Sequence, residues 1–204
     1  MIESTINGIF QTPIYFSKLN RKLTKKELSF IKKTALNAYK NEGNTTSNNT
    51  YILNQKVFNN LKTELDLIIQ DYFNKVICSA DNITPFITQS WLNYTETNQY
   101  HHKHAHPNSL VSGVFYINCD EQFDKIKFHS ETYKAIKPAI KKWNLWNSES
   151  WWFSIKTGDI IMFPSSLTHS VEIKKGNNTR ISLAFNVFIK GTFGSNKELI
   201  ELKI

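Results

Sequence analysis

The segment "YHHKHAHPNSLVSGVFYIN", residues 100–118, places four of the six histidines of the chain immediately before a long apolar run. The run has the β-branched and aromatic composition of a strand, and a Pro-Asn pair marks a turn ahead of it. In an extended strand, residues two apart point to the same face. We therefore expect His102, His104 and His106 to share one face, suited to a metal, and His101 to point away.

Short runs of β type continue on both sides of this segment, from Thr84 onward. Turn residues separate most of them, which is typical of an antiparallel sandwich or barrel. The runs are TPFITQSWLNY (84–94), LVSGVFYI (110–117), KIKFHS (125–130), WWFSI (151–155), DIIMF (159–163), HSVEI (169–173) and RISLAFNVFI (180–189). An earlier run, IFQTPIYF (9–16), is expected to join the same core.

Two amphipathic helices are predicted ahead of the β region, packed outside one sheet. The first covers residues 23–39, where Thr24 and Glu27 have capping-box spacing. A polar stretch at 41–50 is typical of a loop, and helical spacing of apolar residues resumes from 58 to 76. The apolar positions are Leu28, Ile31, Ala35 and Ala38 in the first helix, and Phe58, Leu61, Leu65, Ile68, Ile69, Tyr72 and Val76 in the second.

The length of 204 residues and a hydrophobic content of 40% predict one globular domain, 1–204. Within it, residues 1–80 would supply the early strand and the supporting helices, and residues 84–190 the β core with the metal site. The fold class is mainly β with N-terminal helices (α+β).

Charge and composition narrow the class of partner. The net charge of +8 suggests nucleic acid, but the lysines are spread along the chain and there are only two arginines, so this interpretation is not favoured.

Two cysteines provide neither a disulfide framework nor a cysteine metal cluster. The apolar runs are too short to cross a membrane and the N-terminus does not resemble a signal peptide. We expect a cytoplasmic protein, of a bacterium or of a phage-infected cell.

A metal needs a third ligand, and His169 is the best candidate. It follows a turn, an apolar strand and a second, proline-containing turn in "GDIIMFPSSLTHSVEI", residues 158–173. In a double-stranded β-helix this order returns a distant histidine to the mouth of the His-x-His pair. Two alternatives remain at this point: His169 as an ordinary surface or core residue, and the cluster as a loop that binds metal adventitiously.

Arg180 lies eleven residues after His169, inside an apolar strand that also carries Ser182 on the same face. A guanidinium matches a carboxylate bidentately, and a nearby hydroxyl adds one more donor. The alternative is a salt bridge to an internal acid such as Glu172.

Together these motifs make two segments, residues 89–118 and 158–186, resemble a small family of 2-oxoglutarate-Fe(II) oxygenases of marine bacteria and phages, related in pattern to prolyl hydroxylases. The resemblance implies a double-stranded β-helix (jelly roll) that uses Fe(II), 2-oxoglutarate and O2, usually for hydroxylation. It implies that His104 and His169 bind iron, and that Arg180 and Ser182 hold the distal carboxylate of 2-oxoglutarate.

Further residues follow from the same resemblance. Tyr116 falls where related hydroxylases place a tyrosine that contacts that carboxylate, although it also fits an ordinary core position. Asn93 and Tyr94, one strand earlier, are expected to line the co-substrate pocket, whereas Trp91 is assigned to the core.

The sequence departs from the usual two-histidine, one-carboxylate triad. The second position of the motif is His106, and no Asp or Glu occurs between Glu96 and Asp120. Either three imidazoles bind the metal, or His106 is not a ligand and water or a remote acid takes the third position. We favour His104, His106 and His169, with His102 as an outer partner.

Two rival functions remain: a cupin-like metalloprotein without 2-oxoglutarate and a non-catalytic jelly-roll binding module. Cupins usually carry a glutamate where this chain has Leu110 or Val111, which disfavours the first. The substrate, small-molecule or peptidyl, is not specified by the sequence. An edge strand together with the C-terminal segment ELIELKI (198–204), rich in Leu and Ile, is compatible with a homodimer. The tryptophan-rich segment 141–153 is expected either to cover the substrate or to brace a loop, with one of its last two tryptophans facing inward.

Overall fold

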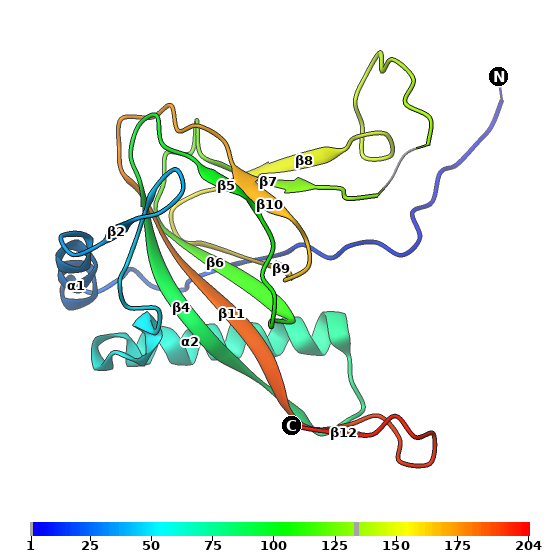
Figure 1. Ribbon diagram of the computed structural model, residues 1–204, viewed down its shortest axis with the longest axis horizontal. Helices are drawn as coiled ribbons and strands as arrows, with labels where there is room; N and C mark the ends of the chain where they lie inside the picture. Colours follow the sequence, from blue (N-terminus) through cyan, green and yellow to red (C-terminus); the bar gives the residue numbers. More distant parts are fainter. Residues whose placement is uncertain (1, 133–134) are drawn as a thin grey trace.

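The computed structural model describes residues 2–132 and 135–204, which form two antiparallel β-sheets with helices on one side (Figure 1). The larger sheet contains β1 (Tyr15–Lys18), β2 (Tyr39–Lys40), β3 (Thr45–Thr46), β4 (Ile83–Thr95), β6 (Val111–Asn118), β9 (Asp159–Pro164), β11 (Arg180–Phe193) and β12 (Leu202–Lys203). The smaller sheet contains β5 (His101–His104), β7 (Lys125–His129), β8 (Ser150–Ser154) and β10 (His169–Val171). The helical elements are α1 (Lys25–Ala35), α2 (Asn59–Tyr72), the 3-10 turns η1 (Ile52–Asn54) and η2 (Lys56–Phe58), and the π-helical turn η3 (Phe73–Ile77).

The order of the larger sheet is β1-β9-β6-β11-β4-β3-β2, with β12 on the end of β11, and that of the smaller sheet is β5-β10-β7-β8. Each run of β type predicted from Thr84 onward is a strand, so the mainly β class is confirmed. The early run contributes only its end, since β1 begins at Tyr15. Pro13 lacks the backbone N–H that a ladder position requires, which fits this late start.

The larger sheet is buried on both faces, because two separate cores form against it. One core lies between the sheets and joins Tyr116 and Phe163 of the larger sheet to Ile126 and Phe128 of the smaller. The other core lies between the larger sheet and the helices. Its largest buried members are Ile31, Ile52, Leu53, Phe58, Leu61, Leu65, Ile69, Tyr72, Leu92 and Phe185. The prediction of two helices packed outside one sheet is confirmed.

The first helix has the predicted N-terminus but a different buried face. The side chain of Thr24 accepts from the Glu27 N–H, and the Glu27 carboxylate accepts from the Thr24 N–H, which completes the capping box. The predicted apolar face is wrong in part, because Ile31 is buried whereas Leu28 is 40% exposed. Glu27 turns inward instead, since the guanidinium of Arg21 binds its carboxylate at 2.7 and 2.8 Å. This bidentate ion pair makes burial of the carboxylate tolerable.

The polar stretch at 41–50 is not the simple loop that was predicted. It contains most of the β2–β3 hairpin, and β3 pairs with the edge of β4. Its residues Asn44, Thr46 and Ser47 are buried. Ser47 explains why: its backbone N–H donates to the Leu92 carbonyl, and its hydroxyl accepts from the Leu92 N–H. The polar side chains of this segment therefore satisfy a sheet edge rather than face water.

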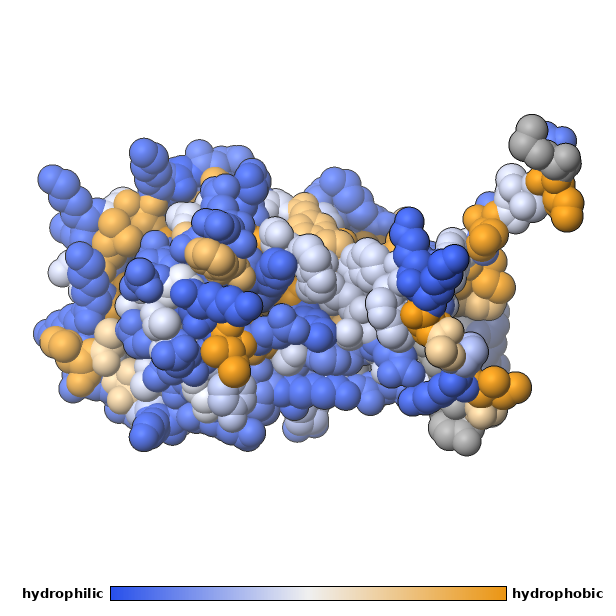
Figure 2. All heavy atoms as spheres, turned by 90° about the horizontal axis from the view of Figure 1, so that it is seen from above, coloured by the Kyte–Doolittle hydropathy of each residue, from blue (hydrophilic) through white to orange (hydrophobic). Residues whose placement is uncertain are grey.

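The surface seen from above is mostly hydrophilic, with apolar residues in small separate patches (Figure 2). The first residues extend away from the body in both views, and they include the exposed Ile2, Ile6, Ile9 and Phe10. Across residues 2–132 and 135–204, the helices are too short and too polar for a transmembrane span.

Candidate metal centre

Three histidines from two distant segments converge between the sheets. One ring nitrogen from each of His104, His106 and His169 lies within 4.8 Å of the others. His104 ends β5 and His169 begins β10, and the two residues are direct partners in the smaller sheet. Their ring centroids are 4.3 Å apart, and the His106 ring lies 4.9 Å from His104 and 5.2 Å from His169. The structure thus brings the three predicted ligands to one point.

Backbone carbonyls fix which ring nitrogen is free in His104 and His169. The Nδ1–H of His104 donates to the carbonyl of His102 at 2.8 Å, and the Nδ1–H of His169 donates to the carbonyl of Leu167 at 3.1 Å. A carbonyl can only accept, so both Nδ1 atoms carry the proton and both Nε2 atoms keep their lone pairs. Such a backbone partner is the usual way in which a metal-binding histidine is oriented. The backbone N–H of His106 donates to the carbonyl of Ser165, which holds that segment in place.

Burial keeps these imidazoles neutral. Desolvation, followed by the neighbouring His104 ring, lowers the pKa of His169 to about 3 and the pKa of His106 to about 4. Burial also lowers the pKa of His104. Neutral rings have lone pairs available at pH 7, so the donor set fits a divalent transition metal such as iron, nickel or zinc.

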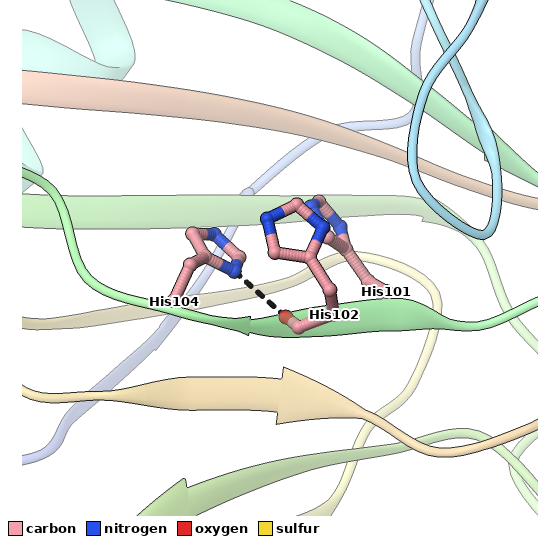
Figure 3. A group of neighbouring side chains, drawn as sticks. All are labelled: His101, His102 and His104. Atoms are coloured by element: carbon pink, nitrogen blue, oxygen red, sulfur yellow. Dashed lines mark hydrogen bonds between the residues drawn. The ribbon is translucent and has the colours of Figure 1, made fainter.

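His101 does not point away, which corrects the prediction. Its ring stacks on that of His104, with centroids 4.6 Å apart and an interplanar angle of 18°. The reason is a β-bulge: β10 pairs His169 with His104 but Val171 with His101, so three steps along β5 oppose two along β10. The extra residue breaks the alternation of faces. His102 lies on the same side, as Figure 3 shows for the three rings of this strand.

Arg180 lies in the same cavity and has no acidic partner within residues 2–132 and 135–204. The side chain is 3% exposed, and its Nη2 donates to the Thr95 hydroxyl at 3.1 Å. Its Nη1 is buried without a hydrogen-bond partner among the described residues. Glu172, the acid proposed as the alternative, is bound instead by Lys127 at 2.8 Å. The salt-bridge interpretation is therefore wrong, and a buried guanidinium nitrogen is left for an anion.

The strand register places three more predicted residues beside this guanidinium. Ser182 of β11 pairs with Asn93 on β4 and with Tyr116 on β6, so the three lie in one row across the sheet. All three line the cavity together with the histidines and Arg180. Asn93 accepts a hydrogen bond from Thr46 at 2.9 Å, so the β3 edge helps to orient it.

Two assignments on β4 are reversed. Trp91 lines the cavity, and its ring lies 5.7 Å from that of His106. Tyr94 belongs to the helix-side core, where its hydroxyl donates to the Ile31 carbonyl at 2.7 Å. Because side chains alternate along a strand, placing Asn93 in the site should have placed Trp91 there and Tyr94 on the opposite face.

The histidines separate two spaces of different size. The inner cavity, with Arg180, has a volume of about 40 Å³, and the outer groove has a volume of about 630 Å³. The groove is lined mainly by aromatic, amide and hydroxyl side chains: Tyr39, Asn41, Thr46, Thr50, Tyr51, Thr88, Gln89, Trp91, Asn108 and Asn186, with Pro107 and four of the histidines. No acid lines either space among the described residues, so the alternative of a remote carboxylate ligand finds no candidate there.

The tryptophan-rich segment lies outside this groove. Trp143 and Trp146 are 59% and 55% exposed, and neither lines the histidine site. The expectation that Trp151 or Trp152 faces inward is wrong, since the two are 38% and 50% exposed. Phe153 is the residue of β8 that packs against the core between the sheets.

Comparison by sequence matches residues 89–186 to the model of a family described as "Putative 2OG-Fe(II) oxygenase". The matched segment contains the three clustered histidines, Arg180 and the row formed by Asn93, Ser182 and Tyr116. No curated protein matches the chain.

Several solved structures share the fold at low sequence identity. An oxidoreductase of the 2OG-Fe(II) oxygenase family from Burkholderia pseudomallei has a TM-score of 0.56 at 13% identity, over 84% of this chain and 83% of its own. HygX from Streptomyces hygroscopicus with nickel, 2-oxoglutarate and hygromycin B bound has a TM-score of 0.56 at 11% identity, over 86% and 82%. A Pseudomonas putida prolyl-4-hydroxylase has a TM-score of 0.54 at 11% identity, over 86% and 92%.

Proposed function

We propose that the chain is an Fe(II)- and 2-oxoglutarate-dependent dioxygenase that hydroxylates its substrate, which the match of residues 89–186 to the 2OG-Fe(II) oxygenase family model supports. The observation that carries the proposal is the presence, in one cavity, of three converging neutral imidazoles and a buried guanidinium that has no acid beside it among the residues described. We assign the two facing sheets to a double-stranded β-helix.

The histidines would hold the metal. His104, His106 and His169 present their nitrogens to one point, and the backbone partners of His104 and His169 aim Nε2 at it. When bound, the iron, with 2-oxoglutarate and O2, would supply oxidative decarboxylation of the keto acid to succinate and carbon dioxide, in which one oxygen atom of O2 enters succinate and the other enters the substrate.

Arg180 and its neighbours would orient the co-substrate. The free Nη1 of Arg180 would donate to the distal carboxylate. The hydroxyl of Ser182, on the same strand, and that of Tyr116, on the adjacent strand β6, would add donors. Asn93, which is oriented by its hydrogen bond with Thr46, would position the carbon chain of 2-oxoglutarate. The apolar walls of Phe163, Phe185 and Ile126 exclude water around these polar groups.

The outer groove would receive the substrate. Its lining combines aromatic rings with amides and hydroxyls and, among the described residues, includes neither acids nor lysines. Such a surface suits a neutral, hydrogen-bonding group, whether it belongs to a small molecule or to a peptide.

Anaerobic titration of the purified chain with Fe(II) and then 2-oxoglutarate tests the proposal. The expected result is the visible charge-transfer band of an iron-bound keto acid, which the variant Arg180→Met should develop only at much higher 2-oxoglutarate concentrations. Iron binding without this band would favour the cupin-like alternative, and the absence of tight metal binding would favour the non-catalytic jelly roll.

A further inference from the structure

A second group of three histidines lies beside the first and shares one member with it. One ring nitrogen from each of His101, His102 and His104 lies within 4.8 Å of the others. The three rings stand on the same side of β5 (Figure 3). This outer trio exists only because the β-bulge brings His101 to the side of His104.

The rings of the two trios form a continuous series from the surface to the interior. The centroids of His102 and His101 are 5.2 Å apart, those of His101 and His104 are 4.6 Å apart, and those of His104 and His169 are 4.3 Å apart. The His102 side chain is 30% exposed, whereas His169 is 6% exposed. The outer trio is therefore the one that solvent reaches first.

His104 can serve only one trio at a time. Its Nδ1 is used in the hydrogen bond to the His102 carbonyl, so Nε2 is its single free donor atom. A ligand common to both groups, with one available lone pair, makes the two positions alternatives rather than a dinuclear site.

The outer end of the series carries a negative charge in a chain of net charge +8. A carboxylate oxygen of Glu42, in the β2–β3 hairpin, lies 3.9 Å from Nδ1 of His102. The nearby Lys103 is bound to Glu131 at 2.9 Å. An acid at the mouth, with the adjacent lysine neutralised, attracts a cation to this end.

We propose that His101, His102 and His104 form an outer binding position for a divalent transition-metal ion, from which the ion passes to His104, His106 and His169 by exchange at His104. The inference rests on the metal centre of the proposed function and adds a loading route to it. Imidazole ligands make the outer position selective for transition metals over Mg²⁺ or Ca²⁺.

Nickel binding to the full chain, with any affinity tag removed, tests the outer position at equilibrium. The double variant His106→Ala/His169→Ala removes two inner ligands and should still bind one Ni²⁺ in calorimetry, more weakly than the wild type. Adding His101→Ala and His102→Ala should abolish this residual binding. If the double variant binds Ni²⁺ no better than the quadruple variant, the outer position does not exist.

The rate of loading provides a second test that leaves the inner trio intact. In His101→Ala/His102→Ala, stopped-flow association of Ni²⁺ should slow by about tenfold, the scale of local enrichment of an ion, while one ion is still bound at equilibrium. His129→Ala is the matched control, because His129 is the one histidine outside both trios and binds Ser170 instead. An unchanged rate would overturn the route. Failure of the proposed function is separate: it would appear as loss of the iron and 2-oxoglutarate band in the wild type.

Discussion

Replacement of Arg180 by methionine should change ligand binding and protein stability in opposite directions. In the ligand-free protein this guanidinium is buried and donates a hydrogen bond to Thr95, and its Nη1 has no partner in the part of the chain that the structure describes. A buried charge without a counter-ion is costly. We therefore expect the free energy of unfolding of ligand-free Arg180→Met to be unchanged or higher by about 1–4 kcal/mol, as for other buried charges replaced by apolar residues.

The affinity for 2-oxoglutarate should fall steeply in the same variant. Two hydrogen bonds from a guanidinium to a carboxylate contribute about 1.5–3 kcal/mol each. Their loss corresponds to an increase in Kd of about 10²- to 10⁴-fold. At a ligand concentration of about 100 times the wild-type Kd, the wild type should gain about 2.7 kcal/mol of stability and the variant almost none.

Thermal unfolding with and without N-oxalylglycine, in the presence of Ni²⁺, measures both effects. For a domain of this size a gain of 2.7 kcal/mol raises Tm by about 5–10 °C. The matched control is Arg21→Met, the only other arginine, whose ion pair with the buried Glu27 is structural. That variant should lose about 3 kcal/mol of stability and keep its ligand-induced shift. The reasoning would be refuted if Arg180→Met were destabilised like Arg21→Met, or if it kept the full shift.

Three further variants or conditions test other parts of the structure. Lowering the pH from about 6.5 to about 3 should destabilise the metal-free protein. In the folded state the pKa of His106 is about 4 and the pKa of His169 is about 3, and both lie below the value of 6.5 in the unfolded chain. The unfolded chain then binds more protons, at up to about 1.4 kcal/mol per pH unit per histidine, which urea denaturation at pH 7.5 and 5 would detect. Gly113→Ala should cost about 1–3 kcal/mol in the same assay, since a Cβ there would lie 2.2 Å from the Phe185 ring. Tyr94→Phe should lower the free energy of unfolding by about 1 kcal/mol and leave the Kd for 2-oxoglutarate unchanged. The reason is that the Tyr94 hydroxyl donates to a helix carbonyl on the opposite face of the sheet. A higher Kd in this variant would show that Tyr94 belongs to the site.

The residues of the inner site could be predicted because their spacing is regular along strands. Arg180 and Ser182 are two apart on β11, where the pairing with β4 stays in register from residue 180 to residue 186. His169 could be placed because it opens the strand after a turn. Antiparallel pairing then brings these positions together without any information beyond the pattern.

The remaining features depend on interactions that a periodic pattern does not contain. The position of His101 follows from one extra residue in β5, and nothing in "YHHKH" distinguishes a bulged strand from a regular one. Glu27 is buried only because Arg21 reaches it. The stretch 41–50 has the composition of a loop, yet its hydroxyls and amides bind a sheet edge that lies far away in the sequence. In each case tertiary contacts override the local preference.

Metal binding by His106 in place of the usual carboxylate would have a consequence for the whole site. Three neutral imidazoles would leave the charge of a divalent ion uncompensated, and the nearest fixed charge in the cavity, Arg180, is also positive. Because no acid lines either space among the described residues, the dianion of 2-oxoglutarate is the group that would neutralise both. The affinities of metal and co-substrate should then be strongly linked, each raising the other by the same factor. Before 2-oxoglutarate binds, the inner site would therefore hold the metal only weakly. An outer position that supplies the ion from nearby is consistent with this weak binding.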